Sequence, residues 1–119
     1  MGVVHELGLV SGVAAAVRRQ VADRPTARVV TVALQVGELS GAVEEALHAA
    51  WPLVATGQLS GARLITTMVP ATVWCPGCAA EQPIDAYFAL TCPVCGTPTA
   101  DLRHGREFEI DYCEVATPD

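Results

Sequence analysis

Four of the five cysteines form two C-x-x-C pairs whose spacing is typical of a metal site. Thirteen residues separate Cys75 and Cys78 from Cys92 and Cys95. Thiolates suit Zn²⁺ in a tetrahedral arrangement, and the prolines and glycines within or beside each pair favour tight turns that aim the sulfur atoms at one point. A closed set of four thiolates leaves no position for water or substrate. The sequence therefore predicts a structural zinc site.

Thiol redox exchange is a different chemistry for the same motifs. A redox C-x-x-C motif is expected in a βαβ context with one active pair, whereas this chain carries two matched pairs. Zinc ligation remains the leading interpretation, and ligand softness favours zinc over iron. The fifth cysteine, Cys113, is expected to be a structural thiol in or beside the last strand.

The N-terminal pair of His5 and Glu6 is the second candidate for metal chemistry. Imidazole is a common metal ligand, but one histidine taken alone is most often structural or solvated. His48 and His104 have that interpretation, since one falls in an expected helix and the other lies beside Gly105 in an expected loop. The residues alone therefore assign no role to this pair.

Two helices are expected in the first half of the chain. Apolar residues from 7 to 21 recur on one face at the helical period, and Pro25 ends that helix. Ser40 is predicted to cap a second helix, because the two glutamates that follow it then lie near the positive end of the helix dipole. Pro52 predicts a kink or an early end in this second helix.

Three strands complete the expected fold. β-branched residues dominate residues 28–37, a second strand is expected at 62–70, and apolar and acidic residues alternate within a third at 106–115. An isolated strand is not stable, so the last one must pair with the sheet formed before the cysteines. The cysteine segment is then an insertion between two strands of one sheet.

The expected fold class is α+β, with a three-stranded sheet and two helices interrupted by a small zinc-ribbon-like module with four cysteine ligands. The first domain is expected to contain residues 1–72 and 105–119, and the zinc module residues 73–104.

Composition narrows the class of protein further. The formal net charge is −6 and the seven basic residues form no basic patch, which argues against nucleic-acid binding. No apolar run approaches the ~18 residues that cross a bilayer, so no membrane segment is expected. Glu6 precedes the first apolar run and Arg18 and Arg19 follow it, the reverse of a secretory signal. A reducing cytoplasm is expected, where cysteines bind metals rather than form disulfides.

Four features in this order resemble the HypA/HybF family of hydrogenase nickel-incorporation proteins. They are the His-Glu-Leu start, the stretch VGELSGAVEEAL at residues 36–47, the two C-x-x-C pairs and the closing strand FEIDYCEV at residues 108–115. The resemblance covers essentially the whole chain. It is specific as a combination, although no one feature would suffice.

The resemblance implies a nickel metallochaperone and not an enzyme. It implies zinc at the four cysteines and Ni²⁺ held near the N-terminus, in transit to the large subunit of a [NiFe] hydrogenase with the help of a HypB-type GTPase. The family's nickel ligands are the His side chain and main-chain nitrogens around a Met-His-Glu start, and the matching positions here are His5 and Glu6. A planar set of nitrogens suits Ni²⁺.

This chain departs from the family at its start, because Met1-Gly2-Val3-Val4 precedes His5. We expect that Val4 corresponds to an alternative start codon translated as Met, which restores Met-His-Glu. Otherwise nickel would depend on His5, local amides and a further ligand. The alternative function is a zinc-ribbon interaction module with no nickel role. Whether the protein forms a homodimer stays open.

Overall fold

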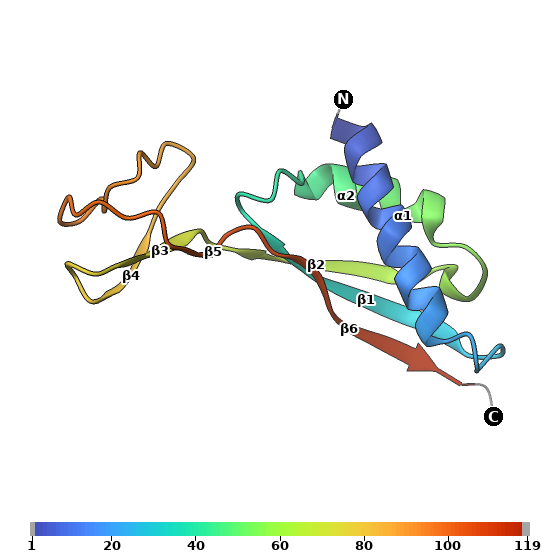
Figure 1. Cartoon of the computed structure of the whole chain (residues 1–119). Coiled ribbons are helices and arrows are strands. Elements are labelled where there is room, and N and C mark those ends of the chain that lie inside the picture. The colour runs from blue at the N-terminus through green and yellow to red at the C-terminus, as the bar shows by residue number, and fades with distance from the viewer. Residues whose placement is uncertain (1, 118–119) are drawn as a thin grey trace. The chain divides into compact units, whose positions relative to one another are not determined.

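The computed structural model describes residues 2–117. Figure 1 shows the elements in chain order. They are α1 (Gly2–Gln20), β1 (Arg28–Gly37), α2 (Glu44–Val54), the short 3₁₀ helix η1 (Gly57–Leu59), β2 (Arg63–Val69), β3 (Thr72–Cys75), β4 (Ala80–Pro83), β5 (Leu102–His104) and β6 (Phe108–Ala116).

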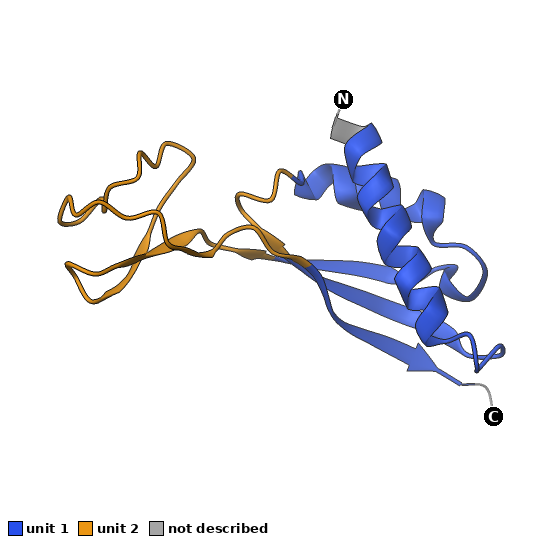
Figure 2. Ribbon diagram, in the orientation of Figure 1, with its two compact units in different colours: residues 1–35, 42–67, 109–119 blue, residues 36–41, 68–108 orange. Residues whose placement is uncertain are grey.

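The chain divides into two compact units (Figure 2). Unit 1 contains Met1–Gln35, Ala42–Thr67 and Glu109–Asp119, and unit 2 contains Val36–Gly41 and Met68–Phe108. None of the described helices is long and apolar enough to span a bilayer.

The predicted three-stranded sheet is confirmed, and its strand order is β2-β1-β6. β1 lies in the centre, so β6 pairs with it although the cysteine segment separates the two in sequence. Figure 1 shows α1 and α2 on one side of this sheet. The buried core includes Val32, Leu34 and Val36 of β1, whereas Val30 on the same strand remains 44% exposed.

Helix α1 carries the predicted apolar stripe. Val10, Val13 and Val17 of the helix are buried, and so is Val21 just after its end at Gln20. The helix begins at Gly2, earlier than the apolar pattern suggested, so His5 and Glu6 lie inside the helix and not before it. The hydrophobic period could not reveal this start, because the first residues of the helix are not part of the apolar stripe.

The predicted helix cap at Ser40 is wrong. Helix α2 begins at Glu44, and the residue at its N-cap position is Val43, which offers no side-chain hydrogen bond. Gly41 explains the difference, because its φ of +85° lies in the left-handed region and interrupts any helix that starts at Ser40. Pro52 lies inside α2, and the helix ends two residues later at Val54.

Helix α1 bonds to both ends of α2. Near the start of α1, Oε2 of Glu6 accepts a hydrogen bond of 2.8 Å from the main-chain N–H of Val43. Near the end of α1, the Arg18 guanidinium donates a hydrogen bond of 2.7 Å to the carbonyl oxygen of Val54. An acid therefore meets the positive end of the α2 dipole and a base meets its negative end.

A second sheet, which the sequence did not predict, has the order β4-β3-β5. β3 and β4 pair antiparallel, with Cys75 opposite Ala80, so the hairpin turn carries Cys78. β5 pairs antiparallel on the other side of β3. These strands are three or four residues long, too short for an alternating pattern to be recognisable.

The end of β1 and the loop after it are hydrogen-bonded to the last residue of β2 and to the segment between β5 and β6. The N–H of Glu38 donates to the carbonyl oxygen of Val69 at 2.9 Å, and the N–H of Leu39 donates to that of Gly105 at 2.6 Å. Gly37 donates to the carbonyl oxygen of Glu107 at 2.6 Å. The glycine-containing start of VGELSGAVEEAL therefore has a structural role: it allows main chains to approach closely.

Candidate metal centres

The four cysteines of the two C-x-x-C pairs meet in one cluster, as predicted. Their sulfur atoms all lie within 4.8 Å of one another, and Sγ of Cys75 is 3.4 Å from Sγ of Cys95. Sγ of Cys78 is 3.9 Å from Sγ of Cys92. Four sulfurs bound tetrahedrally at the usual Zn–S distance would be about 3.8 Å apart. The donor set and its spacing therefore fit one tetrahedral ion with soft ligands.

Each C-x-x-C pair forms a turn in which main-chain N–H groups point at the first sulfur. The N–H of Cys78 donates to Sγ of Cys75 at 3.3 Å, and the N–H of Val94 donates to Sγ of Cys92 at 3.4 Å. In the second turn Gly96 adopts a φ of +77°, a conformation that glycine tolerates best. Such N–H donors stabilise negative charge on the sulfur atoms.

Within the cluster, the pKa values of Cys78 and Cys95 shift in opposite directions. The hydroxyl of Thr97, 3.1 Å from Sγ of Cys95, is the main cause that lowers the pKa of Cys95 to about 6. Hydrogen bonds to the other cysteines, with Cys95 first, raise the pKa of Cys78 to about 12. A metal ion that binds all four sulfurs must displace the protons that remain on them.

Cys113 lies outside the cluster, on β6. Its side chain is partly buried, and this burial raises the pKa of its thiol. This placement agrees with the predicted thiol in the last strand.

The two residues of the N-terminal candidate site lie in different environments. His5 is exposed, whereas Glu6 is completely buried. Consecutive residues of a helix point about 100° apart, so the side chains of His5 and Glu6 diverge. Oε2 of Glu6 is bonded to Val43, and Oε1 has no hydrogen-bond partner among the described residues.

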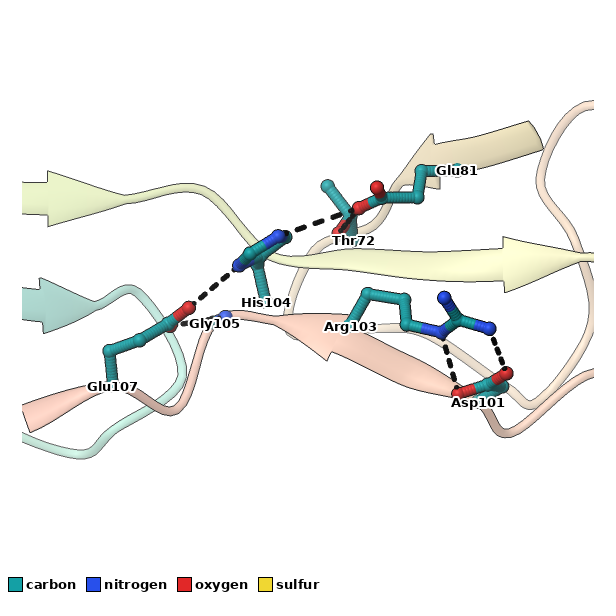
Figure 3. Close-up of polar contacts among 7 residues, drawn as sticks. All are labelled: Thr72, Glu81, Asp101, Arg103, His104, Gly105 and Glu107. Carbon is teal, nitrogen blue, oxygen red and sulfur yellow. Dashed lines mark hydrogen bonds and ion pairs between the residues drawn. The ribbon is translucent and has the colours of Figure 1, made fainter.

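A polar cluster that sequence reasoning missed surrounds His104 (Figure 3). Nδ1 of His104 lies 2.8 Å from Oε2 of Glu107, and its Nε2 lies 3.8 Å from Oε1 of Glu81. Oε1 of Glu81 also accepts a hydrogen bond of 2.7 Å from Thr72. The residues come from β3, β4 and β5 and the segment after β5, so only the pairing of the second sheet brings them together.

Next to this cluster, Arg103 forms a two-pronged ion pair with Asp101, at 2.9 and 2.8 Å (Figure 3). The guanidinium also lies 5.2 Å from the centre of the Trp74 ring. The cation–π contact links β5 to β3, and the ion pair fixes the orientation of the Arg103 side chain.

We expect the free energy of unfolding to depend on pH through the Glu107 carboxyl group. The hydrogen bond with His104, with a second from the N–H of Gly105, holds the pKa of Glu107 below its usual range. A group with a lowered folded pKa adds stability above its unfolded pKa of about 4.3 and loses it as pH falls through the folded pKa. Glu107→Gln should therefore be less stable than wild type near neutral pH, with a deficit that shrinks below about pH 4.

Urea denaturation of wild type and Glu107→Gln at several pH values measures this effect. Glu109→Gln, on the exposed side of β6, is the matched control and should follow the wild-type curve. A deficit of Glu107→Gln that stays constant down to acid pH would show that the lowered pKa does not contribute to stability.

Comparison with known proteins assigns the chain to a family. The sequence profile described as "Hydrogenase/urease nickel incorporation, metallochaperone, hypA" matches residues 4–115. The chain belongs to the HypA family. A hydrogenase maturation factor HypA from Chloroflexus aggregans is 34% identical over 113 residues, which cover 94% of this chain and 99% of that protein. One from Streptomyces avermitilis is 42% identical over 81 residues, covering 67% and 62% of the two chains.

Solved HypA structures share the fold. The solution structure of the Ni metallochaperone HypA from Helicobacter pylori has a TM-score of 0.66 at 16% identity and covers 95% of this chain and 98% of its own. A second HypA solution structure has a TM-score of 0.70 at 17% identity, covering 97% and 98%. The predicted family and its function, hydrogenase nickel incorporation, are thereby confirmed, as is the α+β fold with a four-cysteine module.

Proposed function

We propose that this HypA-family protein binds Ni²⁺ through His5 and neighbouring main-chain nitrogens, Glu6 included, and delivers it to the large subunit of a [NiFe] hydrogenase. A HypB-type GTPase is the proposed partner in this delivery. The observation that carries the proposal is the place of His5, exposed in the first turns of α1 in a chain of this family.

The start of α1 offers nitrogen ligands as well as an imidazole. The first four N–H groups of an α-helix have no acceptor within the helix, and in α1, which begins at Gly2, these groups immediately precede His5 in the chain. Imidazole and amide nitrogens match the donor preference of Ni²⁺. They must lose protons to bind, so nickel affinity should rise with pH.

We further propose that Cys75, Cys78, Cys92 and Cys95 hold zinc. Four thiolates in tetrahedral spacing are the ligand set of structural zinc sites. When bound, the ion cross-links the β3–β4 hairpin to the second C-x-x-C turn. No ligand position is left for the nickel cargo, so the two metals are assigned to separate sites.

His5→Ala is expected to reduce nickel affinity by at least about tenfold while zinc content and fold stay unchanged, because His5 supplies the only side-chain nitrogen of the proposed site. Titration with nickel, followed by calorimetry, measures this. His48→Ala is the control, since His48 is an exposed α2 residue whose Nε2 lies 3.0 Å from the Thr66 hydroxyl. Equal nickel binding by wild type and His5→Ala would favour a zinc-ribbon interaction module without a nickel role.

A further inference from the structure

Helix α2 receives its N-terminal cap from another helix. An α-helix leaves its first N–H groups without acceptors, and Ser, Thr, Asn or Asp at the N-cap position usually supplies one. Here that position holds Val43, which has no side-chain acceptor. The carboxylate of Glu6, 37 residues earlier in the chain, accepts the Val43 N–H instead.

This long-range cap carries a free-energy penalty that a local cap would not. Glu6 is completely buried, and its Oε1 has no hydrogen-bond partner among the described residues. A buried carboxylate oxygen without a partner is unfavourable, and the dipole of α2 offsets only part of that penalty. A serine or aspartate at position 43 could cap α2 locally without burying a charge. The long-range cap is therefore not explained by the stability of α2 alone.

The long-range cap also fixes the position of the first turns of α1. The carboxylate ties the residue next to His5 to the start of α2, while His5 itself stays exposed. In this arrangement Oε2 is occupied by the Val43 N–H, and both carboxylate oxygens are shielded from solvent. The carboxylate is thus placed to hold the turn and not to reach an ion bound at the surface.

We propose that Glu6 is a positioning residue for nickel: its carboxylate caps α2 and thereby fixes the turn of α1 that presents the His5 imidazole and the nearby main-chain nitrogens. This inference rests on the proposed nickel role of His5. It assigns the Glu6 side chain to the support of the site and only the Glu6 main chain to the site itself. Groups that orient metal ligands commonly change metal affinity by about 10–100-fold when removed.

Two substitutions of Glu6 separate positioning from direct ligation. Glu6→Ala removes the cap, and its dissociation constant for nickel should rise by at least about tenfold with zinc content unchanged. Glu6→Gln keeps a carbonyl oxygen that can accept the Val43 N–H, but its amide is a poor nickel ligand. It should retain the wild-type absorption spectrum of bound nickel and bind more tightly than Glu6→Ala.

Arg18→Ala provides a matched control at the other end of the same helix pair. Arg18 bonds to Val54 at the end of α2, and it lies twelve residues from Glu6, about 18 Å along α1. This variant should loosen the packing of α1 on α2 without changing nickel affinity. An equal loss of nickel affinity in Arg18→Ala and Glu6→Ala would show that the loss comes from weaker packing of α1 on α2 in general. That result would overturn the proposal.

The amide resonance of Val43 reports the cap independently of any metal. In the absence of nickel, Glu6→Ala should shift this resonance and speed its hydrogen exchange, and Glu6→Gln should shift it less. A folded Glu6→Gln variant that loses the nickel spectrum would identify the carboxylate as a ligand and overturn the proposal, even if Glu6→Ala does not fold. Wild-type affinity in Glu6→Ala would also overturn it.

The same measurements distinguish this inference from the function on which it depends. If wild type binds nickel no better than His5→Ala, the nickel role fails, although the Val43 resonance still tests the cap. If wild type binds nickel and Glu6→Ala binds equally well, only the positioning role fails.

Discussion

Replacing Cys75 or Cys92 with serine is expected to release the metal and unfold the cysteine-bearing part of the chain. Among residues 68–108 the buried hydrophobic residues are Ala71, Val73, Cys75 and Cys92, two of which are themselves ligands. So few apolar side chains cannot hold short strands together, and segments of this size usually need a metal or disulfides. Structural zinc contributes about 10–16 kcal/mol of apparent binding free energy in small zinc-binding peptides.

Metal analysis and the dispersion of amide resonances from residues 72–104 measure this outcome. Cys113→Ser is the matched control, because Cys113 lies on β6 outside the cluster and its loss should leave zinc content unchanged. A Cys75→Ser variant that keeps one tightly bound zinc per chain and its full thermal stability would refute the assignment of the cluster as a structural metal site.

Gly37→Ala is expected to lower the free energy of unfolding by about 2–3 kcal/mol, the usual result when an added methyl group meets atoms that cannot move. A Cβ at position 37 would lie 2.2 Å from the carbonyl carbon and oxygen of Gly105. These are main-chain atoms, and Gly105 is itself constrained, with a φ of +125° and a close approach to Ala71. The hydrogen bonds of Gly37 and Leu39 across this contact would have to lengthen or break.

Gly12→Ala offers a control in which the same methyl group has the opposite effect. Gly12 lies in α1, and a Cβ there would meet nothing within 4 Å. Alanine is a better helix former than glycine, so this variant should gain about 0.5–1 kcal/mol. Urea denaturation of both variants tests the pair. A stability of Gly37→Ala equal to that of wild type would show that the two main chains can separate without cost.

The sequence by itself determined several features that depend on neighbouring residues. The helical period of the α1 stripe, the β-branched run of β1 and the spacing of each C-x-x-C turn are local patterns, and the structure reproduces them. The pairing of β6 with β1 also followed from the sequence, because an amphipathic strand at the end of the chain needs an existing sheet. The zinc identity and the nickel ligands remain predictions.

Only the tertiary structure decided the features in which distant residues replace a local signal. Ser40 had the right chemistry for a helix cap, but Gly41 turns the chain away from a helical path and Glu6 caps α2 in its place. His104 and Glu81 meet across β3 because β4 and β5, each too short to show a pattern, pair on opposite sides of that strand. The exposed imidazole of His5 and the buried carboxylate of Glu6 belong to adjacent residues of the sequence. Which of the two side chains faces solvent depends on what α1 packs against. Their different roles at the proposed nickel site therefore follow from the fold and not from the sequence pattern.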